Sequence, residues 1–147
     1  MISRYSFRNF QISSLFSFAS RKISTLQPSQ ASNTIFSLSS AQGKAGVAVI
    51  RVSGPKASEV SSLYLTVFHN AKFPKPRVAT LRSILHPITR EVLDYGLVLW
   101  FPGPNSYTGE DVIEFHIHGG NAVIRGILDA LSSLKGFRHA ERGEFTR

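Results

Sequence analysis

The chain has 147 residues, of which 42% are hydrophobic and 18% charged, the balance of one folded globular domain. It contains no cysteine, which excludes disulfides, thiolate metal sites and a cysteine nucleophile, and no apolar run approaches the roughly 18 to 20 residues of a membrane span. The net charge of +8 is divided unevenly: residues 1–32 carry four Lys and Arg and no acid, and the remainder holds 13 Lys and Arg against 9 Asp and Glu. A soluble protein that does not engage membranes is expected.

Residues 1–32 have the composition of a mitochondrial transit peptide, rich in Ser, Phe and Arg and free of acids. Apolar residues within Ile12–Ala19 follow helical spacing, and Arg21–Ser24 resembles a matrix-protease site. A secretory signal and a tail without an address are the alternatives. We expect a transit peptide and linker over 1–32, a folded domain over 33–147, and a location in the mitochondrial matrix.

The first half of this domain predicts a strand, a helix and a hairpin. Gly46–Val52 is almost wholly apolar and β-branched, which predicts a strand buried on both faces. Apolar residues recur at helical spacing after Pro55, so a helix is expected over 55–68. Two further apolar runs, Val78–Leu85 and Val92–Phe101, predict strands joined through His86–Glu91.

The second half begins with a loop of turn formers, Pro102–Gly109, before the alternating strand Val112–His118. Helical spacing then predicts a helix over 121–135 that ends at Gly136, and Phe137–Ala140 is expected to form a last strand. The order β-α-β-β-β-α-β indicates an α+β fold with a mixed, largely antiparallel sheet that two helices cover on one face.

Two charged residues are the best candidates for a site. Arg51 interrupts an apolar strand, so its guanidinium needs either an ion pair with an acid such as Glu114 or an anionic ligand. Glu114, His116 and His118 share one face of a strand at intervals of about 7 Å. This pattern favours a polar cleft; a metal site is the weaker alternative, and His118 alone could simply end the strand.

Glycines and aromatic residues near these strands bear on two kinds of site, a phosphate-binding loop and a surface that stacks on a planar ligand. Gly43–Gly46 precedes a strand and lacks the residues of a P-loop, so we expect no nucleotide triphosphate site in this chain. These glycines favour a tight turn, and the close approach of a ligand to the backbone is the alternative. Tyr107, Trp100 and Phe101 could stack on a planar ligand or belong to the core.

Three segments together resemble the MnmE (TrmE) family of tRNA-modification GTPases. They are Gly43–Gly54, the long box Phe101–Gly120, and Gly143–Arg147 at the end of the chain. The resemblance covers about residues 33–147, and with the leader it indicates the N-terminal domain of a mitochondrial member.

The resemblance implies a domain that binds 5-formyltetrahydrofolate or a related reduced folate, forms a homodimer, and is similar in fold to the folate-binding part of aminomethyltransferases. Arg51 and Glu114 match the family's folate-contacting arginine and glutamate. A carboxylate suits the donor edge of a pterin, and a guanidinium suits its carbonyl or carboxylate oxygens. No catalytic or metal-binding residue is assigned.

The complete family protein works with an MnmG-type flavoprotein on the wobble uridine of tRNA. Its GTP, Mg and K sites belong to a GTPase domain that would follow Arg147, as would a folate-contacting lysine. We therefore expect a fragment that is not catalytic alone. A stand-alone RNA-binding or adaptor module, using the residual charge of +4, is the alternative.

Overall fold

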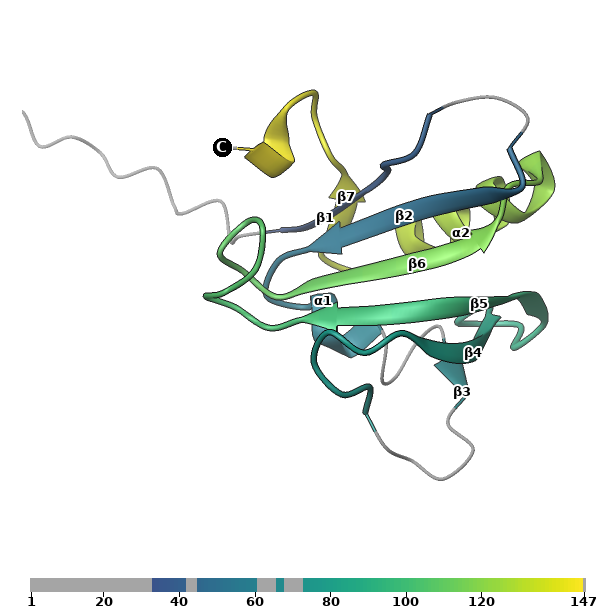
Figure 1. Cartoon of the computed structure of the whole chain (residues 1–147). Coiled ribbons are helices and arrows are strands. Elements are labelled where there is room, and N and C mark those ends of the chain that lie inside the picture. The colour runs from purple at the N-terminus through teal and green to yellow at the C-terminus, as the bar shows by residue number, and fades with distance from the viewer. Residues whose placement is uncertain (1–32, 42–44, 61–65, 68–72, 147) are drawn as a thin grey trace, which may run out of the picture.

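A mixed sheet of seven strands forms the body of the protein. The computed structural model describes residues 33–41, 45–60, 66–67 and 73–146. The strands lie in the order β3-β4-β5-β6-β2-β1-β7 (Figure 1), and every neighbouring pair is antiparallel except β1 with β7. The strand bounds are β1 Thr34–Leu38, β2 Val47–Ser53, β3 Thr66–Val67, β4 Thr80–Leu85, β5 Val92–Phe101, β6 Val112–His118 and β7 Phe137–His139.

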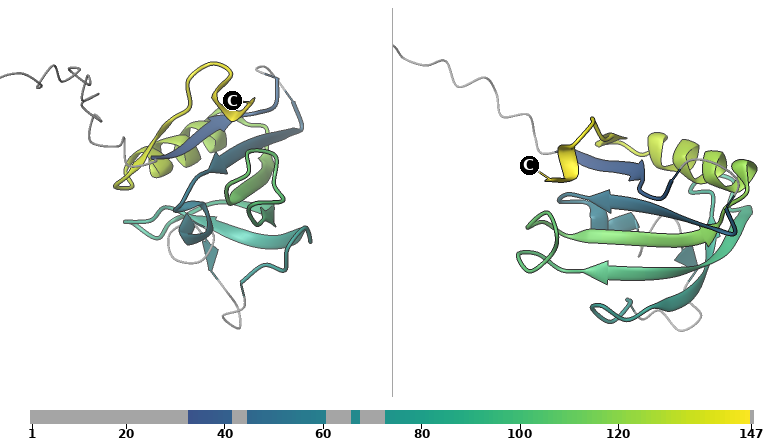
Figure 2. Two further views of the ribbon diagram at one scale, coloured as in Figure 1. Left: turned by 90° about the vertical axis from the view of Figure 1, so that its left-hand side faces the viewer. Right: turned by 45° about the horizontal axis from the view of Figure 1, so that its top comes forward.

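Two helices lie behind the sheet in the view of Figure 1 and pack on the same face. Helix α1 is a single turn, Ala57–Glu59, and helix α2 runs from Asn121 to Ser132. Helix α2 lies against one side of the twisted sheet, as the two views of Figure 2 show. Its buried residues Ile127, Ala130 and Leu131 belong to the core cluster. The predicted α+β class, the largely antiparallel sheet and the placement of both helices on one face are confirmed.

Strand β6 shows why only one face of the sheet forms the core. Ile113, Phe115 and Ile117 are buried under the helices, and the polar residues between them point the other way. We call this other side, which carries Arg51, Glu114 and His116, the open face. The alternation predicted for this strand is therefore confirmed.

Strand β2 corrects one expectation. It is not buried on both faces: Ala48 is 2% exposed, whereas its neighbour Val47 is 59% exposed. The helices cover only the side that carries Ala48, Ile50 and Val52. Arg51 consequently does not interrupt a doubly buried strand but lies on the open face.

The expected helix over 55–68 is wrong in its length, and the predicted element order lacks two strands. Ala57 and Val60 enter the core as the helical spacing predicted, but the β-branched pair Thr66–Val67 forms β3, which pairs with β4 at the sheet edge. Strand β1, also unforeseen, lies between β2 and β7 and buries Phe36 completely. The serines next to it lower the hydrophobicity of this segment, so the short apolar run is not predicted to be a strand.

The remaining predicted elements, the hairpin β4–β5, helix α2 and strand β7, are present. The predicted end of the helix is wrong: α2 ends at Ser132 with Ser133 as its C-cap, and Gly136, whose φ is 88°, lies in the turn that leads into β7. The transit peptide over 1–32 and the Gly43–Lys44 part of the predicted turn lie outside the described residues. Within the described part of the chain, no helix is long and apolar enough to cross a membrane.

Candidate ligand-binding site

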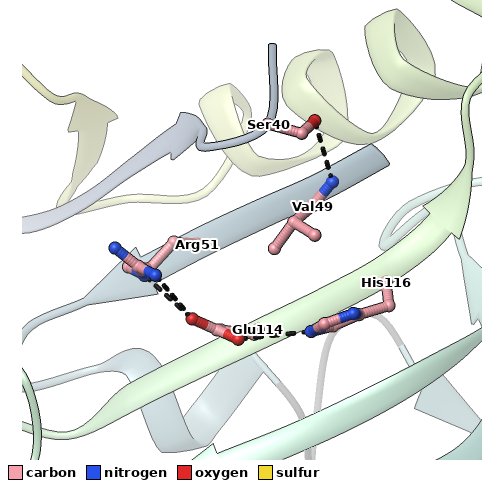
Figure 3. Close-up of polar contacts among 5 residues, drawn as sticks. All are labelled: Ser40, Val49, Arg51, Glu114 and His116. Carbon is pink, nitrogen blue, oxygen red and sulfur yellow. Dashed lines mark hydrogen bonds and ion pairs between the residues drawn. The ribbon is translucent and has the colours of Figure 1, made fainter. Parts of the chain in front are cut away.

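The centre of the site is an ion pair that the sheet register creates. Arg51 of β2 lies directly opposite Glu114 of β6. The guanidinium donates two hydrogen bonds to one carboxylate oxygen, Oε1, from Nε at 3.0 Å and from Nη2 at 2.8 Å (Figure 3). Both side chains project from the open face, so the pair predicted as one alternative for Arg51 exists where a ligand can also reach it.

The second oxygen of Glu114 faces His116, the next open-face residue of the same strand. His116 Nε2 lies 3.2 Å from Oε2, which completes the row Arg51–Glu114–His116 in Figure 3. The three side chains are 26%, 16% and 33% exposed. An ionised carboxylate has about four lone-pair sites, so Glu114 keeps capacity for a further donor. The Nη1 nitrogen of Arg51 has no hydrogen-bond partner among the described residues.

Two aromatic rings flank the guanidinium of Arg51. Its Cζ lies 5.3 Å from the ring centroid of Tyr107 and 5.8 Å from that of Phe145. Both distances are within the range of cation–π attraction. Tyr107 is 66% exposed, so of the two interpretations offered for this residue the core placement is wrong. An accessible aromatic ring next to a cation can contact a planar ligand.

The loop between β5 and β6 holds Tyr107 in this position by folding back over one end of the open face. Thr108 Oγ1 lies 2.7 Å from the hydroxyl of Ser53, which follows Arg51 on the same face of β2. Arg77 Nη2 donates to the carbonyl of Asn105 at 2.6 Å, and Gly103 N donates to the Asp111 carboxylate at 2.9 Å. The loop therefore closes this end of the face.

A 3₁₀ helix, η2 (Glu144–Thr146), brings Phe145 to the same end of the sheet. Both terminal nitrogens of Arg138 in β7 donate hydrogen bonds to the Glu144 carboxylate. The Glu141 amide donates to the same carboxylate at 2.8 Å. The side-chain hydrogen bond with Glu144 raises the pKa of Arg138 above its ordinary value. The pair ties η2, and with it Phe145, to the edge of the sheet.

The other predicted candidates lie elsewhere. Trp100 packs edge-on against Phe73, away from the Arg51–Glu114 pair, with centroids 4.6 Å apart. His118 engages Asp94 of β5, whose carboxylate accepts from the His118 amide and contacts its ring Nδ1, both at 2.8 Å. Among the described residues, no group of three His, Asp or Glu side chains is placed to hold a metal ion.

The arrangement fits a planar molecule with hydrogen-bonding edges. Glu114 accepts N–H donors, Arg51 donates to carbonyl or carboxylate oxygens, and Tyr107 and Phe145 supply ring faces. Sequence reasoning found Arg51, Glu114 and Tyr107 but missed Phe145, which reaches the site only through the fold. It also missed Asp94, although a single acid within an apolar strand was a usable signal.

Comparison with known proteins places this domain. The sequence model described as the N-terminus of the GTP-binding protein TrmE matches residues 34–147. A Danio rerio protein named mitochondrial 5-taurinomethyluridine-tRNA synthase subunit GTPB3 is 64% identical over 115 residues, which are 78% of this chain and 22% of that protein.

Two other relatives agree. The Homo sapiens protein of the same name is 54% identical over 114 residues, which are 78% of this chain and 23% of the relative. A Beijerinckia indica tRNA modification GTPase MnmE is 48% identical over 130 residues, or 88% of this chain and 28% of the relative. The chain thus spans less than a third of the length of these relatives.

Proposed function

Because the chain belongs to the MnmE/TrmE family of tRNA modification GTPases, whose N-terminal domain it contains, we propose that it binds a reduced folate such as 5-formyltetrahydrofolate at Arg51 and Glu114. The observation that carries the proposal is the geometry of this pair. It lies on the open face of the sheet, it keeps unused hydrogen-bonding capacity, and two aromatic rings flank it.

The chemistry of a pterin matches these groups. Its 2-amino group and N3–H form a donor edge that a carboxylate accepts in a bidentate manner, and Glu114 supplies that carboxylate. The pterin carbonyl accepts from a guanidinium, and Arg51 supplies those donors. Tyr107 and Phe145 give the ring apolar, polarisable neighbours. On this proposal the domain is similar to folate-binding aminomethyltransferase domains.

Within the complete protein, we propose that this domain also holds two subunits together as a homodimer. The dimer would act with an MnmG-type flavoprotein on the wobble uridine of mitochondrial tRNA. The GTP, Mg and K sites would lie in a GTPase domain outside this chain, so the chain alone contributes folate binding and assembly. The names of its relatives, which are tRNA modification GTPases and tRNA synthase subunits, support this role.

A mitochondrial location is supported by the Danio rerio and Homo sapiens relatives, whose names include that word. We expect import to remove about the first 23 residues, because the leader is free of acids and carries the Arg21–Ser24 site. N-terminal sequencing of the protein from purified mitochondria measures the new terminus. Recovery of intact Met1 from the cytosol would contradict the expectation.

The folate site is tested by calorimetric titration of 5-formyltetrahydrofolate into the 147-residue chain and its Arg51→Ala and Glu114→Gln variants. Each variant loses a charge-assisted hydrogen bond worth about 1.5–3 kcal/mol. We therefore expect affinity to fall roughly 10- to 150-fold. Circular dichroism shows whether each variant remains folded.

Matched controls lie on helix α2, across the sheet from the site. Arg125→Ala and Asp129→Asn remove the same charges from exposed positions, and both should bind the folate as the wild type does. If Arg51→Ala and Glu114→Gln fold and still bind with unchanged affinity, the site is wrong. If these two variants unfold, the Arg51–Glu114 ion pair is needed for folding, and its assignment as the folate-binding site is also contradicted.

The RNA-binding alternative gains no support from the described surface. Over the described residues, ten Lys and Arg stand against nine Asp and Glu, so the residual charge of +4 is not concentrated there. RNA binding through phosphates weakens steeply with salt. Strong, salt-sensitive tRNA binding without folate affinity would favour the adaptor over the folate domain.

A further inference from the structure

A groove lies between helix α2 and the edge of the sheet that β1 and β7 form. Its volume is about 420 Å³, which is within the range of natural binding pockets. The proposed folate site on the open face includes none of its residues. The lining combines apolar and polar side chains: Ser37, Leu38, Asn121, Ile124, Arg125, Leu128 and His139.

Strand β1 extends beyond its outer neighbour β7, which leaves part of its edge unpaired. Among the described residues, the hydrogen bonds across this edge end at the Phe36 carbonyl, which accepts from the Ala140 amide at 2.9 Å. On the other side of β1, the Ser39 amide donates to the Val49 carbonyl at 2.7 Å. Because hydrogen-bonded pairs alternate along antiparallel strands, the Leu38 amide points away from β2 and toward the unpaired edge. An extended chain in the groove can therefore continue the pairing where β7 ends.

His139 supplies an acceptor beside this free amide. The Ser132 hydroxyl donates its single proton to the Leu128 carbonyl at 2.9 Å. Its contact of 3.3 Å with His139 Nε2 therefore requires the proton on the histidine, which leaves Nδ1 of the neutral ring as an acceptor. The ring also packs against Phe36, with centroids 4.5 Å apart, and this contact holds its orientation. The groove thus offers one donor and one acceptor to a peptide main chain.

Arg125 gives the groove a positive charge that no described residue neutralises. Its guanidinium takes part in none of the ion pairs of the described residues, and Asp129, one turn further along α2, does not pair with it. The described residues that line the groove include no Asp or Glu. Ile124 and Leu128 lie beside Arg125 on the same helix and are only partly buried. The groove is therefore complementary to a segment that carries both a carboxylate and an apolar side chain.

We propose that this groove docks an extended, acidic segment of a partner protein by strand addition beside β1. The main chain of the segment accepts a hydrogen bond from the Leu38 amide and donates one to His139. An apolar side chain packs on Ile124 and Leu128, and a carboxylate pairs with Arg125. This surface is distinct from the folate site, so the inference does not depend on folate binding.

The groove is less suited to RNA. Proteins bind single-stranded RNA through a series of cations and through aromatic faces on which bases stack. Among the described residues that line this groove, Arg125 is the single Lys or Arg, and the face of the one ring, His139, is engaged by Phe36. A protein segment with one or two acids fits these groups better.

The test uses the 147-residue chain and three fluorescein-labelled heptapeptides in which valine alternates with glutamate, glutamine or lysine. Fluorescence anisotropy should show that the glutamate peptide binds roughly tenfold or more tightly than the glutamine peptide, because the latter lacks a charge-assisted hydrogen bond. The lysine peptide should bind more weakly still. Arg125→Ala should abolish the preference for glutamate. Lys135→Ala is the control, because it removes an exposed cation outside the groove.

Hydrogen exchange measured by NMR locates the bound peptide. Exchange of the Leu38 amide should slow when the glutamate peptide saturates the chain, because the peptide carbonyl accepts from it. Amides in the turn between β4 and β5 should exchange as before. Protection of other amides without protection of Leu38 would place the peptide elsewhere and would overturn the proposal.

The remaining outcomes are also decisive. Equal affinity for the three peptides, no binding of any of them, or a glutamate preference that Arg125→Ala leaves intact overturns the proposal. Binding of oligouridylate that Arg125→Ala abolishes, without peptide binding, assigns the groove to RNA and overturns it as well. A dimer that Arg125→Ala dissociates in sedimentation, without peptide binding, assigns the groove to a second copy of the chain instead. If Arg125→Ala does not fold, Arg125→Gln makes the same comparison.

Discussion

Replacement of Phe115 by alanine should lower the free energy of unfolding by about 3–5 kcal/mol. Phe115 is fully buried on the core face of β6, and it belongs to the cluster that joins the sheet to both helices. Its removal leaves a cavity that rigid neighbours cannot fill. Because Glu114 and His116 belong to the same strand, we also expect the hydrogen bonds that link Arg51, Glu114 and His116 to be weakened.

Urea unfolding followed by circular dichroism measures this loss. Leu81→Ala is the matched control: Leu81 is a large apolar residue of the same sheet, but it lies on the open face and is 65% exposed. Its replacement should change stability by no more than about 0.5 kcal/mol. If Phe115→Ala does not fold at all, Phe115→Leu should show a smaller loss. Similar losses for Phe115→Ala and Leu81→Ala would contradict the division of the sheet into a core face and an open face.

That division could be predicted for β6 but not for β2, for a physical reason. Strand β6 alternates between apolar and polar residues, so its sequence predicts which side packs against the core. Strand β2 carries apolar residues on both sides, although Val47 is largely exposed. Hydrophobicity alone does not distinguish an exposed apolar residue of the open face, such as Val47, from a residue of the core.

The helix expected over 55–68 illustrates a different limit. Ala57 and Val60 pack into the core where the helical spacing placed them, yet the chain pairs Thr66 and Val67 with β4. β-branched residues gain from pairing at a sheet edge, and a local spacing rule cannot foresee a partner strand further along the chain.

The site shows the same contrast between local and distant information. The ion pair of Arg51 could be anticipated, because a charged residue in an apolar strand requires a partner and Glu114 lies on a polar face. Phe145 could not, since it reaches Arg51 only after β7 and the Arg138–Glu144 pair set the position of η2. Tyr107 stood between these cases: its position in a loop allowed a ligand contact, and its exposure shows that the ring is accessible.

Gly119→Ala should destabilise the domain by about 3 kcal/mol, at the upper end of the usual penalty for overpacking. An added Cβ would lie 2.0 Å from the carbonyl oxygen of Ala45 and 2.8 Å from its carbonyl carbon. Both are backbone atoms that cannot rotate away. The backbone at Gly119 needs no positive φ, so the penalty arises from lost space and not from conformational strain.

The close approach also positions the end of β6. The Gly119 amide donates to the Gly46 carbonyl at 3.2 Å, which fixes the chain directly after His118. Thermal and urea unfolding measure the change, with Gly46→Ala as control, because a Cβ there meets nothing within 4 Å. That variant should keep or slightly raise stability, by up to about 1 kcal/mol, through a less flexible unfolded chain. Equal stability of the two variants would show that Gly119 and Ala45 do not lie in contact.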